Sequence, residues 1–110
     1  MKKIVYNKLV RDNIPEIILA DGCTPKIEKL NKSEYKIELK KKLVEEAKEV
    51  LSTDSKKDLI KELADIQEVL SGICESYKIE CGDVTKLSRK IRKERGGFAK
   101  KIYLKYVSKR

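Results

Sequence analysis

Hydrophobic residues recur at intervals of three and four in two long stretches of the chain, and this spacing predicts two long helices. The apolar face of the first stretch, from Asn31 to about Leu51, consists of Leu39, Leu43, Ala47, Val50 and Leu51, with Tyr35 and Val44 at its borders. The apolar face of the second, from Ser55 to about Tyr77, consists of Leu59, Ile60, Leu63, Ile66, Val69, Leu70, Ile73 and Tyr77. Either Asn31 or Ser33 caps the first helix, and Ser55 begins a capping-box pattern for the second.

Shorter elements are predicted on both sides of these helices. Asn13-Ile14-Pro15-Glu16 opens a short helix that Asp21-Gly22 ends, and residues 23–30 read as a loop or a short strand. Cys81-Gly82-Asp83 separates the second long helix from a third, Val84 to Arg95, which Gly96-Gly97 ends. Alternation at Ile102, Leu104 and Tyr106 predicts a short strand that pairs with residues 4–6. The expected fold is all-α, with two long antiparallel helices, shorter helices and short terminal strands.

The length of 110 residues favours one domain over the whole chain, 1–110, with 40% apolar residues available for a core. Each long helix carries an apolar arc of about half its circumference, which is more than one partner helix covers. We therefore expect a homo-oligomer, at least a dimer, in which two chains complete a four-helix core. The chain has no apolar run of the ~18 residues that a membrane span needs and no apolar signal core, so we expect a cytoplasmic protein without a membrane partner.

The chain has no histidine, which excludes catalytic triads with histidine, Cys-His dyads and His-ligated zinc sites. Its three cysteines form no Cys-x-x-Cys motif. Any acid or base must therefore be a carboxylate, lysine, tyrosine or water. The net charge of +9 is concentrated at one end, because residues 84–110 hold eleven Lys and Arg against one Glu. This imbalance favours a polyanionic partner, either nucleic acid or the phosphates of a nucleotide.

Several carboxylates fall on or beside the apolar faces of the two long helices. On a helical wheel, Glu46 lies inside the first apolar arc, Glu49 lies just past its edge and Glu45 points further toward solvent. On the second helix, Glu62 lies inside the arc and Asp65 borders it. A buried carboxylate without a partner costs several kcal/mol, so one inside an apolar arc needs a partner or a raised pKa.

If the two helices pack antiparallel through these arcs, Glu46 and Glu49 approach Glu62 and Asp65, and their like charges repel unless a cation lies among them. Oxygen ligands favour Mg²⁺ or Mn²⁺ over zinc. The alternative is that these acids pair with lysines such as Lys42, Lys48 and Lys61 at the rim of the core. The helical wheel alone leaves both interpretations open.

Four segments in order along the chain carry a family resemblance. Glu45-Glu46-x-x-Glu49 followed by Glu62-x-x-Asp65 resembles the signature of the all-α nucleoside triphosphate pyrophosphatase superfamily, which includes MazG-type enzymes and phosphoribosyl-ATP pyrophosphatases. Residues 7–15 resemble the KLVRDKIP opening of a small MazG-like group, with Asn13 where lysine is usual. Residues 62–69 resemble its ELADxxEV helix, and residues 93–98 its KxxRGGF end.

The resemblance implies an α-helical oligomer that uses Mg²⁺ to hydrolyse a nucleoside triphosphate to a monophosphate and pyrophosphate, and it suggests a house-cleaning role. It implies Glu46, Glu49, Glu62 and Asp65 as metal ligands, and it places Glu45 where a residue orients water or lies behind the ligands. Phosphoribosyl-ATP is the alternative substrate, because the match to that enzyme is weaker than the match to the small MazG-like group.

Anhydride cleavage needs a metal, a positioned water and cationic donors for the phosphates. Glu49 or Glu45 is the candidate general base. The candidate phosphate donors are Lys8, Arg11, Lys90, Lys93 and Arg95, although any one cation among 27 is more often a solvated surface charge. A nucleic-acid-binding helical module without catalysis is the rival hypothesis; it has no role for Glu46 or Glu62, and no interleaved aromatic residues support it.

Overall fold

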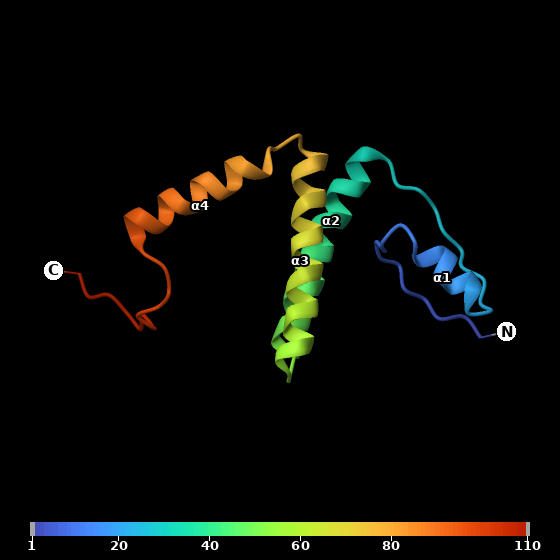
Figure 1. The fold of residues 1–110 in the computed structure, drawn as a ribbon, viewed down its shortest axis with the longest axis horizontal. Coiled ribbons are helices and arrows are strands. Elements are labelled where there is room, and N and C mark those ends of the chain that lie inside the picture. The colour runs from blue at the N-terminus through green and yellow to red at the C-terminus, as the bar shows by residue number, and fades with distance from the viewer. Residues whose placement is uncertain (1, 110) are drawn as a thin grey trace. The chain divides into compact units, whose positions relative to one another are not determined.

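The computed structural model describes residues 2–109, and all regular secondary structure within them is helical (Figure 1). The four helices are α1 (Ile14–Ala20), α2 (Lys32–Leu51), α3 (Lys56–Ser76) and α4 (Cys81–Arg95). The predicted all-α class is confirmed. Contacts between residues divide the chain into a first unit, residues 1–79, and a second unit, residues 80–110. That the two units form a single domain stays a prediction.

The helical hairpin of α2 and α3 forms because each helix has a strong start and a short turn joins them. Asn31 accepts a hydrogen bond from the Glu34 backbone N–H at 2.9 Å, and the Glu34 side chain accepts one from the Asn31 N–H. This capping box identifies Asn31, rather than Ser33, as the N-cap. The Ser55 hydroxyl accepts from the Asp58 N–H at 3.1 Å in the same way. The two predicted helices are confirmed, with ends within about one residue of the expected ones.

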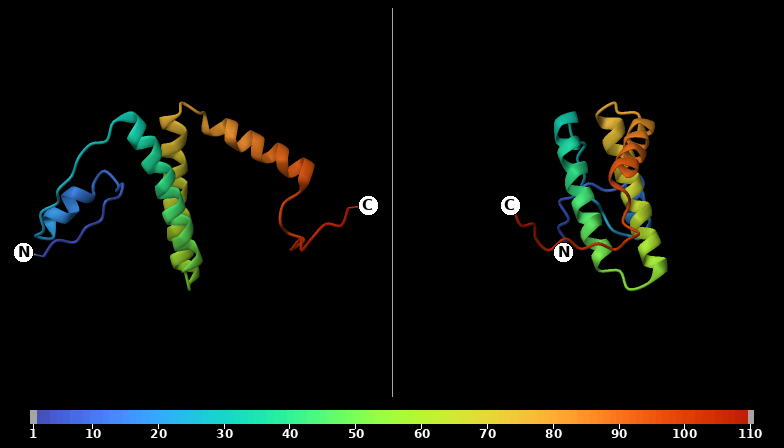
Figure 2. Two further views of the ribbon diagram at one scale, coloured as in Figure 1. Left: turned by 180° about the vertical axis from the view of Figure 1, so that it is seen from behind. Right: turned by 90° about the vertical axis from the view of Figure 1, so that its left-hand side faces the viewer.

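Helices α2 and α3 run side by side as a hairpin (Figure 2) and contact each other along their length. Leu39 of α2 and Val69 of α3 are buried there. Gly72 allows the close approach, because a Cβ at this position would lie 3.0 Å from Leu39 Cδ2. Because Gly72 has no side chain, α2 packs close to α3 at this point.

A second apolar strip of the hairpin stays exposed. It consists of Val44 and Leu51 on α2 and of Ile60, Leu63 and Leu70 on α3. Leu51 is 88% exposed and Ile60 is 58% exposed. One partner helix therefore leaves much of each arc uncovered, as the width of the arcs predicted. Within residues 2–109, no helix combines the length and the apolar composition that a membrane span requires.

The start of α4 differs from the predicted one. Residues 81–83 were expected to separate two helices, but they form the first turn of α4. The break between α3 and α4 comes earlier, at residues 77–80, where Lys78 has a φ of 55° in the left-handed region. Asp83 suits the first turn of a helix, where a negative charge faces the helix dipole. The predicted end is correct, since Gly96 adopts a φ of 86° that an L-residue rarely takes.

The predicted terminal strands do not form in the part of the chain that the structure describes. Residues 4–6 and 102–106 are irregular. A two-stranded ribbon without a third strand or a covering helix is at best marginally stable, so alternation alone does not produce one. Residues 23–30 form a loop, the first of the two alternatives expected for them.

Candidate functional site

The hairpin brings carboxylates of α2 and α3 together, as the helical wheels predicted. Glu46 is only 5% exposed and Glu62 only 9% exposed, although both are charged residues. Carboxylate oxygens of Glu46, Glu49 and Glu62 all lie within 4.8 Å of one another. Two of these residues come from α2 and the third from α3, so the cluster exists only because the helices pack in this register.

Two oxygens of this cluster lack a protein partner. Glu46 Oε2 and Glu62 Oε2 are buried and make no hydrogen bond. Lys42 Nζ lies 3.6 Å from Glu46 Oε1, and Lys61 Nζ lies 3.5 Å from Glu62 Oε1. A buried carboxylate oxygen without a donor is costly, and a hard divalent cation is the ligand that satisfies several such oxygens at once. The donor set therefore fits Mg²⁺ or Mn²⁺.

Proton affinities in the cluster reflect burial and mutual repulsion. Burial, together with the neighbouring Glu62 and Glu49 carboxylates, raises the pKa of Glu46. The pKa of Glu49 is raised first by its hydrogen bond with Glu62 and then by burial. The pKa of Glu62 is lowered, because its interaction with Glu46, together with Glu49 and Lys61, outweighs burial. Without a cation, the three groups therefore share protons that a bound metal would displace.

Asp65 and Glu45 lie beside the cluster, and each is held by two cations. Arg11 donates to Asp65 Oδ1 at 2.8 Å, and Lys61 donates to Asp65 Oδ2 at 3.0 Å. Burial raises the pKa of Asp65, but the hydrogen bonds from Lys61 and Arg11 outweigh it, and the net pKa lies below the ordinary value. Asp65 is therefore ionised and already paired.

Glu45 is held in the same manner. Lys8 Nζ donates to Glu45 Oε1 at 3.0 Å, and Lys42 Nζ lies 3.4 Å from Oε2. Burial raises the pKa of Glu45, but the hydrogen bond from Lys8 and the charge of Lys42 outweigh it, so that the net pKa is lowered. The rim pairing that the sequence offered as an alternative thus applies to Lys42 and Lys61, and it coexists with the buried cluster.

Of the five predicted phosphate donors, two lie at the acidic cluster. Lys8 and Arg11 belong to the irregular segment before α1, and they reach residues 37 and 54 positions away in the sequence. Sequence reasoning placed both among the substrate donors but did not foresee that they pair with Glu45 and Asp65. No periodicity in the sequence encodes a contact between an irregular segment and a distant helix.

The other three predicted donors, Lys90, Lys93 and Arg95, lie in the second unit. All three are exposed on α4, a helix without a buried residue. Arg92, Lys93 and Arg95 together make its last turn strongly basic. Their contribution to the site stays a prediction.

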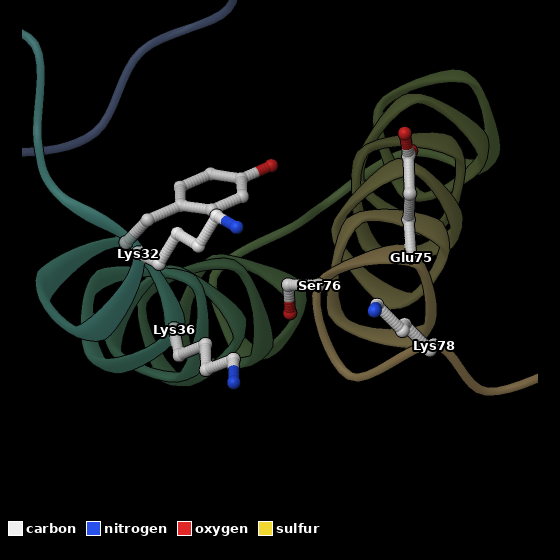
Figure 3. A pocket seen from close by; sticks show the side chains of 6 residues that line it. Lys32, Lys36, Glu75, Ser76 and Lys78 are labelled. Atoms are coloured by element: carbon white, nitrogen blue, oxygen red, sulfur yellow. The ribbon is translucent and has the colours of Figure 1, made fainter.

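A separate basic groove of about 490 Å³ lies at the other end of the hairpin (Figure 3). It is lined by Lys32, Tyr35, Lys36, Glu75, Ser76 and Lys78. Lys36 and Lys40 also stack on the Tyr77 ring, with Nζ 4.7 and 4.9 Å from its centroid. None of the predicted metal ligands lines this groove, so we place the candidate site at the carboxylate cluster.

Comparisons with known proteins identify relatives of this chain. A family model described as phosphoribosyl-ATP pyrophosphohydrolase matches residues 16–95, well over half of the chain, and includes α2 and α3 entirely. An uncharacterised protein of Mycolicibacterium smegmatis is 47% identical over 49 residues, which are 44% of this chain and 50% of that protein. The chain thus aligns with about half the length of this curated relative. No solved structure matches the chain significantly.

Proposed function

We propose, since the chain belongs to the phosphoribosyl-ATP pyrophosphohydrolase family, that it is a Mg²⁺-dependent nucleoside triphosphate pyrophosphohydrolase that releases pyrophosphate and a nucleoside monophosphate. The family consists of hydrolases of phosphoric anhydride bonds that typically depend on a divalent metal. The observation that carries the proposal is the meeting of Glu46, Glu49 and Glu62 from facing helices within 4.8 Å. The two buried, unpartnered oxygens support the same conclusion.

In this proposal Glu46, Glu49, Glu62 and Asp65 hold the cation. A bound Mg²⁺, or Mn²⁺ in its place, supplies charge neutralisation on the phosphates and lowers the pKa of a coordinated water. The burial of Glu46 and Glu62 keeps their carboxylates rigid, which fixes the position of the site relative to the hairpin.

Glu49 is the better candidate for the general base. Among residues 2–109 no lysine or arginine forms an ion pair with Glu49, so its carboxylate is available to accept a proton from water. Glu45 has a lowered pKa and is tied to Lys8 and Lys42, so it suits orientation of a water rather than proton transfer.

Cationic side chains complete the proposed site by holding phosphate oxygens. Lys8 and Arg11 already lie at the carboxylates, where the phosphates of a bound nucleotide would also lie. Arginine makes two parallel hydrogen bonds to a phosphate, so Arg11 is suited to this contact. Lys90, Lys93 and Arg95 are proposed to contribute further donors from α4.

The substrate has two candidates. The resemblance to small MazG-like enzymes favours a nucleoside triphosphate and a house-cleaning role, while the description of the matching family favours phosphoribosyl-ATP. Both are cleaved at the same kind of bond, between the α- and β-phosphates, so the proposed roles of the carboxylates apply to either.

We also propose that the protein acts in the cytoplasm as a dimer or a larger homo-oligomer. The exposed strip that contains Leu51, Ile60 and Leu63 supports this, because a second hairpin would bury it. Light scattering at micromolar concentration should detect an oligomer, and a stable monomer would contradict the proposal.

The direct test is a panel of canonical and damaged nucleoside triphosphates together with phosphoribosyl-ATP, each incubated with the protein and Mg²⁺ and scored for pyrophosphate. We expect pyrophosphate from at least one of them, and none after chelation of the metal. Release of single phosphates, or turnover that survives chelation, would contradict the proposed reaction.

A further inference from the structure

Arg11 pairs with one carboxylate that the metal is proposed to need. Its guanidinium lies 2.8 Å from Asp65 Oδ1, at a site where the Arg11 side chain is 56% exposed and that of Asp65 is 22% exposed. The contact joins residues 54 positions apart, from an irregular segment to α3. Arg11 thus supplies a positive charge directly to a carboxylate that is proposed to bind the cation.

The ion pair between Arg11 and Asp65 is of a kind that another anion can break easily. Ion pairs between exposed side chains contribute little net free energy, because water competes for both partners. The segment that carries Arg11 has no regular secondary structure before α1 begins at Ile14. A long arginine side chain at such a position can turn from a carboxylate to a nearby phosphate without disturbing the hairpin.

A phosphate is also the stronger partner for Arg11. A triphosphate carries several negative charges against the single charge of a carboxylate, and its oxygens match the guanidinium geometry as well as those of a carboxylate do. A nucleotide whose phosphates reach the carboxylate cluster would therefore take Arg11 from Asp65. Asp65 Oδ1 would then be available to the cation, while Lys61 still holds Oδ2, and the arginine charge would no longer oppose the metal.

We infer that Arg11 couples the two binding events: it pairs with Asp65 in the free protein and transfers to a substrate phosphate, so that nucleotide binding strengthens metal binding. This inference rests on the proposed function. Arg11 acts as a positioning residue in this scheme. The coupling is reciprocal: the factor by which the nucleotide raises metal affinity is the factor by which the metal raises nucleotide affinity. The free protein is thereby kept from holding its metal tightly in the absence of a substrate.

Lys8 provides a matched control within the same segment. It carries the same charge and makes a similar contact, 3.0 Å to Glu45. Glu45 is not among the proposed metal ligands, so the loss of Lys8 frees no ligand. A general effect of removing positive charge would appear in both variants, whereas competition for a ligand appears only for Arg11.

The experiment is calorimetric titration of the 110-residue protein with Mn²⁺, with and without a nucleoside triphosphate analogue that has a methylene bridge between the α- and β-phosphates. Without the analogue, Arg11→Ala should bind Mn²⁺ roughly 2- to 5-fold more tightly than the wild type, because a competing ion pair is lost. The same variant should bind the analogue about 10-fold more weakly or worse. Lys8→Ala should change Mn²⁺ affinity by less than about 2-fold.

The outcomes separate this inference from the function on which it rests. If wild-type protein binds Mn²⁺ but Arg11→Ala binds it equally or more weakly, the coupling role is wrong and the metal site stands. If Lys8→Ala tightens Mn²⁺ binding as much as Arg11→Ala does, the effect is one of general charge, and the coupling role is again wrong. If the wild type binds no Mn²⁺, the proposed metal site itself is overturned.

Discussion

The acids of the hairpin and the cations of α4 are both charged groups on amphipathic helices, but their surroundings are opposite. Glu46 and Glu62 lie in the contact between α2 and α3 and are at most 9% exposed. Lys90, Lys93 and Arg95 lie on a helix that has no buried residue. A charged side chain in a packed contact has few positions open to it, whereas a cation on a solvated face has many.

This difference teaches where sequence evidence for function is strong. A carboxylate inside an apolar arc costs several kcal/mol of folding free energy unless it has a partner. Its presence there therefore predicts a bound cation or a bound proton. An exposed lysine costs almost nothing. The predictions below therefore expect large effects from the acids and smaller ones from the cations.

The largest effect is expected from Glu62→Gln. The amide keeps the shape of the side chain but removes the charge that would bind the metal, so kcat should fall by about 100-fold or more. Circular dichroism should show the same helix content as the wild type, because the packing of α3 is unchanged. Steady-state kinetics on the substrate found in the panel would measure the loss.

Intermediate effects are expected from Lys93→Ala and Arg95→Ala. If these side chains hold the leaving pyrophosphate, each change should reduce kcat/KM by roughly 1 to 3 kcal/mol of transition-state stabilisation without unfolding the protein. Kinetics with nucleotides and binding to duplex DNA should be measured on the same two variants.

The rival hypothesis of a nucleic-acid-binding module makes the opposite forecast for these variants. It expects unchanged nucleotide kinetics and a duplex affinity whose salt slope falls by about one for each lost cation. Unchanged nucleotide kinetics would remove α4 from the proposed site while leaving the carboxylate cluster untouched.

A smaller effect, on stability, is expected from the raised pKa values of Glu46 and Glu49. Between the ordinary and the raised pKa, the folded protein binds more protons than the unfolded chain, so the metal-free protein should lose stability as the pH rises through this window. Metal binding should strengthen over the same window, because the protons that compete with the metal leave.

The Glu46→Gln variant tests whether repulsion in the cluster destabilises the metal-free protein. The neutral side chain removes the repulsion, so metal-free Glu46→Gln should melt a few degrees above the wild type at pH 7, on the order of 1 kcal/mol, and its stability should depend less on pH. Glu68→Gln, which removes the same charge from an exposed position of α3, serves as the control. A lower melting temperature for Glu46→Gln than for Glu68→Gln would argue against repulsion in the cluster.

The sequence predicted the hairpin and the carboxylates well, because both depend on local rules. Caps at Asn31 and Ser55 determine where the helices begin, and the helical period determines that Glu46 and Glu62 lie inside the apolar faces. The start of α4 was predicted three residues too late, because a helix tolerates glycine in its first turn, where Gly82 lies.

The pairing of Arg11 with Asp65 was beyond the sequence for a different reason. Hydrophobic periodicity predicts helices and strands but not the path of an irregular segment. It therefore does not predict where the loop of residues 23–30 places the N-terminal segment. The predicted terminal strands failed similarly, because alternation describes a strand that has a partner and does not provide one.

The central claim is that the buried carboxylates of the hairpin, and not the exposed cations of α4, hold the divalent ion. Titration with Mn²⁺, with the free ion followed by electron paramagnetic resonance, tests it in the absence of any substrate. The wild type and Lys93→Ala should bind Mn²⁺ with the same saturable affinity, and Glu62→Gln should bind it at least about 10-fold more weakly. Equal affinities of the wild type and Glu62→Gln would contradict the claim.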